Sequence, residues 1–259
     1  MAMKNIRIRE MERYIYEHEY VTINELSEKF SIHINTVRTY INELASRGIV
    51  DKKYGGVSYK SYRLPTSYDE RLKMNVNEKS DIGRMAATLL QEEDVIYIDA
   101  GTTTPMLFQA AQELPKRLTI ITNSLAVINW CFDCSNYDFF VLPGKIDREL
   151  HGFASLETIE SLQTYNIQKA FLGCRGIKNN GDLSTGSPID AKLKETILRV
   201  SKCCILMASS DKVDHSSVLN FSNLREFDYW VCDRNDGAAK KLADTVGISF
   251  IAPEPDKTP

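Results

Sequence analysis

The sequence predicts an α/β protein with two parts: a small N-terminal winged helix-turn-helix, followed by a mostly parallel-sheet, Rossmann-like domain. Two observations lead to this prediction. The first part shows three helical patterns and then a strand, a glycine turn and a second strand. After residue 77, helical and strand patterns alternate, as in a parallel sheet flanked by helices. We therefore expect a winged helix-turn-helix domain over 1–62, a linker over 63–77 and a second domain over 78–252.

Length and composition fit a cytoplasmic protein with a packed core. The chain has 259 residues, 43% of them hydrophobic, which suffices for one or two domains. No apolar run approaches the roughly 20 residues of a membrane helix, and the N-terminus lacks an apolar signal core. The six cysteines are expected to be reduced, and Cys131 and Cys134 lack the second pair of ligands that zinc requires. We expect no metal and no cofactor.

Charge is distributed unevenly along the chain. The net charge is −3, yet residues 1–64 carry 11 Lys and Arg against 8 Asp and Glu. The remainder carries 21 against 27. This asymmetry indicates a basic module joined to an acidic body.

The N-terminal part contains three predicted helices, over residues 6–17, 22–30 and 35–47. Thr22 and Glu25 form a capping box at the start of the second helix, and Gly48 ends the third. A short turn followed by a helix with an exposed polar face is typical of a DNA-binding helix-turn-helix. The residues expected to reach base edges are Asn35, Thr36, Arg38, Thr39 and Asn42.

A hairpin with a Gly-Gly turn follows the third helix and predicts a wing that contacts the phosphate backbone. The residues expected in this contact are Lys52, Lys53, Tyr54, Gly55 and Gly56. The alternative is a three-helix protein-interaction module in which Arg38 is a solvated surface charge. The order of capping box, turn, polar helix face and basic wing favours DNA binding.

The second part alternates between predicted helices and strands. The helices are expected over 78–91, 104–114, 124–132, 155–164, 189–200 and 236–246. The strands are expected over 95–99, 118–122, 137–142, 169–172, 203–208 and 229–232. In such open sheets, ligands bind outside the carboxyl ends of the strands.

The run from Val95 to Thr104 predicts an anion site at one of these strand ends. An apolar strand meets Asp99, then Gly101, then three threonines, and a helical pattern begins. Backbone N–H groups at such a turn point toward an anion, and threonine hydroxyls donate to it. The alternative is an ordinary turn in which threonines cap the helix. Polar residues that follow the other strands favour the anion: Thr122, Asn123, Ser124, Gly144, Gly173, Arg175, Gly176 and Lys212.

Both parts resemble the DeoR family of bacterial transcription regulators. In the first part the resemblance lies in Thr36-Val37-Arg38, Leu44, Gly48 and Tyr54–Val57. Over residues 68–233 it lies in Asp99–Thr103, Thr122–Ser124, Lys169–Gly173, Gly176 and Lys212. The resemblance implies a sugar-phosphate-binding effector domain related to ribose-5-phosphate isomerases. It also implies that Gly101–Thr104 take the phosphate, that Lys212 neutralises it or holds a sugar oxygen, and that Lys169 belongs to the matching segment. The full effector set is Asp99, Gly101, Thr102, Thr103, Thr104, Thr122, Asn123, Ser124, Gly144, Lys169, Gly173, Arg175, Gly176 and Lys212.

The chain departs from the family pattern at several positions. Thr39 and Tyr40 stand where the family usually has Arg and Asp, and His33 stands where it commonly has a Ser cap. Arg175 replaces an acid, and Ser209 replaces an Asp. We hypothesise that Arg175 favours a more anionic ligand, such as a bisphosphate or a sugar acid phosphate. The alternative is that Arg175 faces solvent or pairs with Asp182.

The resemblance implies a DNA-binding transcriptional regulator, a repressor of a carbohydrate-metabolism operon whose operator binding is modulated by a phosphorylated sugar. The expected partners are a double-stranded DNA operator, a phosphorylated sugar effector and further copies of the chain in a homodimer or homotetramer. No membrane partner and no catalytic residue are expected, so the chain is not expected to be an enzyme. Two alternatives remain. One is an isomerase-like enzyme fused to a DNA-binding module, using Asp99 and Asp211. The other is a regulator that binds DNA and needs no ligand.

Overall fold

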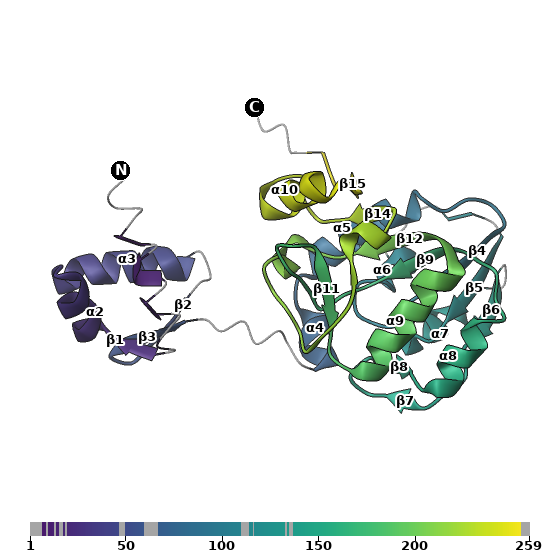
Figure 1. The fold of residues 1–259 in the computed structure, drawn as a ribbon, viewed down its shortest axis with the longest axis horizontal. Coiled ribbons are helices and arrows are strands. Elements are labelled where there is room, and N and C mark those ends of the chain that lie inside the picture. The colour runs from purple at the N-terminus through teal and green to yellow at the C-terminus, as the bar shows by residue number, and fades with distance from the viewer. Residues whose placement is uncertain are drawn as a thin grey trace. The chain divides into compact units, whose positions relative to one another are not determined.

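The chain forms two compact units, Met1–Arg63 and Leu64–Pro259, in the computed structural model (Figure 1). The structure describes residues 7–8, 10–12, 14–15, 18, 20–46, 50–59, 67–109, 114–115, 117–132, 134 and 137–254. Within this part of the chain, no helix is long and apolar enough to cross a membrane.

The first unit contains the helices expected for a helix-turn-helix. The described residues between 7 and 18 are helical, and they are followed by α2 (Ile23–Phe30) and α3 (Ile34–Ser46). Leu26 and Val37 are fully buried between the helices and belong to one apolar cluster with Ile15. The capping box of Thr22 and Glu25 is present, as predicted. Gly48 lies outside the described residues.

The wing is a three-stranded antiparallel sheet in the order β1-β3-β2. Its strands are β1 (Tyr20–Thr22), β2 (Val50–Lys53) and β3 (Gly56–Tyr59). The hairpin is confirmed, but its turn lies one residue earlier than expected. Tyr54 and Gly55 form the turn, Gly55 has a φ of 77°, and Gly56 is already the first residue of β3. Strand β1 was not predicted, because only three residues form it.

A seven-stranded sheet, parallel throughout, forms the centre of the second unit. Its strands, in spatial order, are β15 (Ser249–Ile251), β14 (Tyr229–Val231), β12 (Ser201–Met207), β9 (Ile167–Leu172), β4 (Asp94–Ile98), β5 (Leu118–Thr122) and β6 (Asp138–Val141). The six predicted strands are confirmed within one or two residues at each end. Their near-continuous apolar sequence reflects burial of both faces of a parallel sheet.

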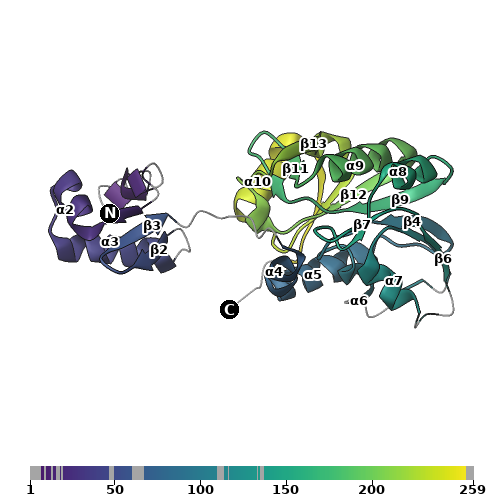
Figure 2. The ribbon, with the colours of Figure 1, turned by 90° about the horizontal axis from the view of Figure 1, so that it is seen from below.

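Helices cover both faces of this sheet (Figure 2). One face packs against α5 (Val76–Ala87), α6 (Met106–Gln109) and α7 (Leu125–Cys131). The other packs against α8 (Leu156–Leu162), α9 (Pro188–Val200) and α10 (Gly237–Val246). Alternation along β4 explains both contacts, since Ile96 and Ile98 join the first core and Tyr97 joins the second.

Several short elements were not predicted. A further sheet, which is antiparallel, contains β10 (Gly176–Ile177), β11 (Asp182–Thr185) and β13 (Leu219–Asn223). A small hairpin joins β7 (Ile146–Asp147) to β8 (Gly152–Phe153), and two 3-10 turns occur, η1 (Ser210–Lys212) and η2 (Leu224–Glu226). These segments have two to five residues, which is too short for a hydrophobic period to be recognised.

The expected linker over 63–77 is too long. The structure forms α4 (Tyr68–Lys73) within this range, with a capping box at Ser67, and α5 begins at Val76. Helix α4 packs against the rest of the second unit: the Tyr68 ring stacks on the His151 ring with the centroids 4.2 Å apart. The contact was not foreseeable because the partner is distant in the sequence.

Candidate functional site

A buried ion-paired triad lies at the carboxyl edge of the parallel sheet. Asp99 directly follows β4, and its side chain accepts a hydrogen bond from Lys194 of α9. Lys194 also lies 3.4 Å from Asp190, one helical turn earlier. The backbone N–H of Gly173 donates to Asp99 Oδ2 at 3.2 Å, so the ends of β4 and β9 converge on one carboxylate.

The charges of the triad are unequally satisfied. Burial penalises the charged carboxylate and raises the pKa of Asp99 to about 6. Burial also acts against the ammonium of Lys194, but the facing carboxylates of Asp190 and Asp99 outweigh it and raise the pKa of Lys194. Asp99 Oδ1 is buried without a hydrogen-bond partner among the described residues. Asp190 Oδ1 is likewise buried without a hydrogen-bond partner among these residues, so each carboxylate of the triad keeps one acceptor unused.

The threonine loop follows this triad directly. Thr102, Thr103 and Thr104 are 7%, 4% and 1% exposed, and Gly101 has a φ of 149° that favours glycine. Thr104 Oγ1 donates to the carbonyl of Asp99 at 2.7 Å, which holds the loop in place. Helix α6 begins two residues after Thr104 and is described over only four residues. The buried threonines therefore lie on a loop that precedes the described part of α6.

The residues at the end of β5 and after it form hydrogen bonds with the segment that leads into the loop. Asn123 Oδ1 accepts from the Tyr97 hydroxyl at 2.8 Å and from the N–H of Ala100 at 3.1 Å. Thr122 donates to a carbonyl of β4, and Ser124 caps α7 by accepting from Val127. Thr122 and Asn123 thus bond to the end of β4 and to Ala100, directly before the loop, whereas Ser124 bonds within its own segment. These bonds fix the segment that leads into the loop.

Two of the expected glycines are explained by packing. A Cβ at Gly144 would lie 2.2 Å from Thr158 Oγ1, and one at Gly176 would lie 2.5 Å from the carbonyl oxygen of His215. Gly173 differs, because its N–H bonds Asp99. Of the expected glycines after β6 and β9, only Gly173 borders the buried carboxylate.

Arg175 and Lys212 lie near the end of β9. Arg175 Nη2 is 2.7 Å from Glu149 Oε1, and the arginine side chain is only 11% exposed. The alternative in which Arg175 faces solvent or pairs with Asp182 is therefore wrong: its partner is Glu149. Lys212 Nζ donates to the carbonyl of Cys174 at 2.8 Å, and Cys174 directly precedes Arg175 in the sequence.

Lys169 lies toward the amino ends of the parallel strands, at the opposite edge of the sheet from Asp99. Its inclusion in the expected effector set was therefore wrong. It lies in the first half of β9, and its Nζ is 2.6 Å from Asp94 Oδ2 at the start of β4. It also donates to the carbonyl of Leu89 at 2.8 Å. Because the strands are parallel, a residue near their amino ends cannot reach a ligand at their carboxyl ends.

The structure adds residues that the sequence analysis missed. Asp190 and Lys194 were visible as an acid and a base four residues apart on a predicted helix. Neither Arg71 nor Lys79 was expected, because Arg71 fell in the predicted linker and Lys79 resembled an ordinary surface charge. Lys79 is in fact 5% exposed and donates to the carbonyl of Arg71.

The expected DNA-contacting residues are largely exposed. On α3, Asn35, Arg38, Thr39 and Asn42 are exposed and Thr36 is half-buried; on the wing, Lys52, Lys53, Tyr54 and Gly55 are exposed. Gly56 is buried, since a Cβ there would lie 2.6 Å from the Tyr20 hydroxyl. The wing turn is fixed by a bond from the N–H of Ile23 to the carbonyl of Gly55.

His33 takes the place of a capping serine. It directly precedes α3, and its Nδ1 accepts from the N–H of Asn35 at 3.3 Å. A helix start that lacks the usual hydroxyl is therefore still supplied with an acceptor.

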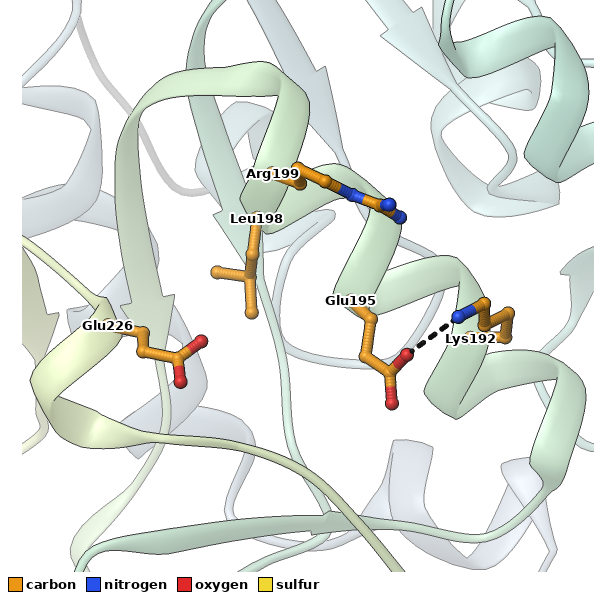
Figure 3. Close-up of a pocket in the computed structure, with 5 residues that line it drawn as sticks. All are labelled: Lys192, Glu195, Leu198, Arg199 and Glu226. Atoms are coloured by element: carbon orange, nitrogen blue, oxygen red, sulfur yellow. Dashed lines mark hydrogen bonds and ion pairs between the residues drawn. The ribbon is translucent and has the colours of Figure 1, made fainter.

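A surface hollow of about 350 Å³ is lined by Lys192, Glu195, Leu198 and Arg199 of α9 and by Glu226 of η2 (Figure 3). Lys192 and Glu195, which line it, form an ion pair with side chains 58% and 43% exposed. It contains none of the residues expected to bind an effector. Within the described residues, no group of three or more His, Cys, Asp and Glu side chains could hold a metal ion.

Comparison with known families matches both units. The DeoR-like helix-turn-helix domain matches residues 7–63, and the DeoR C-terminal sensor domain matches residues 74–234. The chain belongs to the DeoR family. It is therefore a DNA-binding transcriptional regulator with a sensor domain.

This DeoR-family protein is similar to known regulators over most of its length. It is 31% identical to the HTH-type transcriptional regulator IolR of Bacillus subtilis, over 85% of this chain and 87% of that protein. It is 27% identical to the HTH-type transcriptional repressor GlcR of B. subtilis, over 94% of each. Among solved structures, the sorbitol operon regulator SorC of Klebsiella pneumoniae is similar over 91% of this chain and 97% of that chain, with a TM-score of 0.41 and 15% identity.

Proposed function

We propose that this regulator represses a carbohydrate-metabolism operon and that a phosphorylated sugar, bound at the carboxyl edge of the sheet, changes its affinity for operator DNA. The observation that carries the proposal is a buried carboxylate whose Oδ1 has no hydrogen-bond partner in the described part of the chain, Asp99, directly before a loop of three buried threonines. A carboxylate suits a sugar hydroxyl, and threonine hydroxyls with backbone N–H groups suit a phosphate. The sensor-domain match supports the same assignment.

Each part of the sugar phosphate has a candidate partner. Gly101–Thr104 hold the phosphate, and Asp99 accepts from a hydroxyl of the sugar. Lys212 is close to the end of β9 and neutralises part of the ligand's charge. Lys194 keeps Asp99 oriented, since both side chains are almost fully buried.

On the DNA side, α3 contacts base edges and the β2–β3 hairpin contacts the phosphate backbone. Arg38 is the one arginine on the exposed face of α3, and arginine forms a bidentate contact with guanine. One winged helix offers a small interface, so a homodimer or homotetramer binding paired half-sites is proposed. The name of the similar repressor GlcR favours repression over activation.

A sensor fits the site better than an isomerase. A sugar isomerase needs a carboxylate that is free to move a proton at a sugar carbon. Asp99 is held by Lys194 and by the N–H of Gly173, and Asp211 is held by Asn75 at 2.7 Å and by Ser209. Asp99 is thus fixed through Oδ2, and both oxygens of Asp211 accept bonds from the protein, so neither acid is free of structural bonds.

Thermal melting of the full chain with a panel of sugar phosphates tests the proposal. A ligand at 100 times its dissociation constant should add about 2.7 kcal/mol to the free energy of unfolding. Thr103→Val, which removes one hydroxyl from the loop, should reduce this shift. Thr245→Val, an exposed change on α10, should leave it unchanged. A regulator that needs no ligand would show no shift with any compound.

A further inference from the structure

Four basic side chains from separate segments gather beside the Asp99 triad. Arg71 lies on α4, Lys79 on α5, Arg175 after β9 and Lys212 on η1. Hydrogen bonds connect them in pairs: Lys79 Nζ donates to the carbonyl of Arg71, and Lys212 Nζ donates to the carbonyl next to Arg175. We call these four residues the basic cluster.

Two guanidinium groups of the basic cluster meet at one glutamate. Arg71 Nη2 donates to the carbonyl oxygen of Glu149 at 2.5 Å. Arg175 Nη2 lies 2.7 Å from the carboxylate of the same residue. Glu149 is 45% exposed, whereas Arg175 is 11% exposed, so the acid can move away while the arginine stays.

The cations of the cluster repel one another. Burial and the positive charge of Arg175 lower the pKa of Arg71 to about 10. Burial and the charge of Lys212 lower the pKa of Lys79 to about 8. The nearby acid Asp211 offsets part of this repulsion but already accepts from Asn75 and Ser209. An anion placed among these groups relieves the repulsion.

The cluster adjoins the proposed effector site. The carboxylate of Asp190 is close enough to Arg71 to offset part of the lowering of the arginine's pKa. Asp190 in turn shares Lys194 with Asp99. In the proposed function the phosphate lies at Gly101–Thr104 and a sugar hydroxyl on Asp99, and the basic cluster is connected to Asp99 through Asp190 and Lys194.

We infer that the basic cluster receives a second anionic group of the effector, a carboxylate or a second phosphate, at the end away from Gly101–Thr104. This inference rests on the proposed function and narrows its ligand to phosphorylated sugar acids and sugar bisphosphates. The guanidinium of Arg175 presents two parallel N–H donors, which match a carboxylate or a phosphate. Glu149 occupies this position in the free protein and is displaced by the ligand.

Calorimetric titration of the full chain tests the inference with four defined probes. Fructose 1,6-bisphosphate and 6-phosphogluconate carry two anionic groups, whereas fructose 6-phosphate and glucose 6-phosphate carry one. We expect at least one of the doubly anionic compounds to bind tenfold or more tightly than its singly phosphorylated counterpart. Arg175→Gln should abolish that preference and change binding of the monophosphates less than threefold. Lys192→Gln, on the exposed side of α9, serves as the charge-matched control.

A second variant separates ligand binding from a purely structural role of the cluster. Glu149→Gln removes the competing carboxylate, so it should tighten binding of the doubly anionic probe several-fold. If Glu149 only anchors the two arginines, the same change weakens binding or leaves it unaltered, which would overturn the inference. Should Arg175→Gln fail to fold, Arg71→Gln and Glu149→Gln decide the question.

The two proposals fail in different ways. If the monophosphates bind as tightly as the doubly anionic probes, or if Arg175→Gln keeps the preference, the second anion site is refuted and the sugar-phosphate site stands. If none of the four compounds binds at millimolar concentration and no compound of the sugar-phosphate panel shifts the melting temperature, both are refuted.

Discussion

Asp99 and Lys194 form a buried ion pair in the sensor domain. Both side chains are less than 5% exposed, and Asp190 completes the group. Removal of one partner of a buried pair leaves an uncompensated charge, which costs more than the pair itself contributes. The triad is therefore expected to stabilise the folded state as well as to border the proposed site.

Lys194→Met should destabilise the chain by about 3–5 kcal/mol at pH 7, because two carboxylates then remain buried without a cation. Lys192→Met on the same helix should change stability by no more than about 0.5 kcal/mol, since that side chain is 58% exposed. Urea unfolding measures both changes in the free energy of unfolding.

Carboxyl groups with raised pKa values stabilise the folded state below their unfolded pKa and lose this contribution as the pH rises through their folded pKa. The deficit of Lys194→Met should therefore shrink between pH 7 and pH 5, and a deficit that is independent of pH would contradict the account.

Affinity for the doubly anionic probe should fall as the pH rises from 7 to 9. Lys79, whose pKa is lowered to about 8, loses its proton in this range. The charged groups that face it are Lys212, Asp211, Arg71 and Glu78. At one pH unit above its pKa only about a tenth of a lysine remains charged. Titration at pH 7, 8 and 9 measures the effect, and Lys79→Arg should flatten it. Equal slopes in the two proteins would exclude Lys79 as a ligand contact.

The sequence predicted the centre of the proposed site but not its surroundings. Asp99 and Gly101–Thr104 could be predicted, because one short segment contains the strand end, the turn and the hydroxyls. Lys169 was placed wrongly, because the family match covers a whole strand and does not say which end faces the ligand. Arg71 and Lys79 were missed, because their position depends on α4 packing against residues that are distant in the chain.

At the scale of elements, α3 and the β2–β3 hairpin present two kinds of exposed residue. The side chains on α3 differ in hydrogen-bonding pattern, whereas Lys52 and Lys53 on β2 carry charge alone. Contacts to phosphates set affinity, and contacts to base edges set sequence preference. The two elements are expected to contribute separately.

Lys52→Ala should weaken binding to all duplexes similarly and reduce the slope of log affinity against log salt by roughly one unit. Arg38→Ala should instead relax sequence preference, with a loss of about 1–3 kcal/mol on the preferred duplex and less on others. Fluorescence anisotropy with a selected and a scrambled duplex, at several salt concentrations, distinguishes the two. A uniform loss of affinity in Arg38→Ala would show that this arginine contacts only phosphate.

Long elements were predictable and short ones were not. The parallel strands and their helices appear in the sequence as apolar runs and periodic stretches, so the seven-stranded sheet was foreseen apart from β15. The β10-β11-β13 sheet was not, because its strands are brief and pair with residues up to about 40 positions away. The hairpin turn was misplaced by one residue, since either glycine of Gly55-Gly56 could occupy it.

At the scale of the whole molecule, one chain contains two compact units, and α4 is the first described element of the second unit. Arg71 on this helix also belongs to the basic cluster. A ligand that draws Arg71 toward itself or displaces the carboxylate of Glu149 is expected to change how α4 is held. Effector binding alters the affinity of the DNA-binding unit for DNA only if the effector binds two arrangements of the chain with different affinity.

The most direct test of this account is the affinity of the full chain for DNA with and without bound effector. The duplex is one that the protein itself selects from a random pool, and the effector is the sugar phosphate that gives the largest melting shift. The account predicts that saturating effector changes the dissociation constant for this duplex at least fivefold, and that Thr103→Val removes the change without altering affinity in the absence of effector. A sugar phosphate that binds the chain tightly but leaves its DNA affinity unchanged would contradict it.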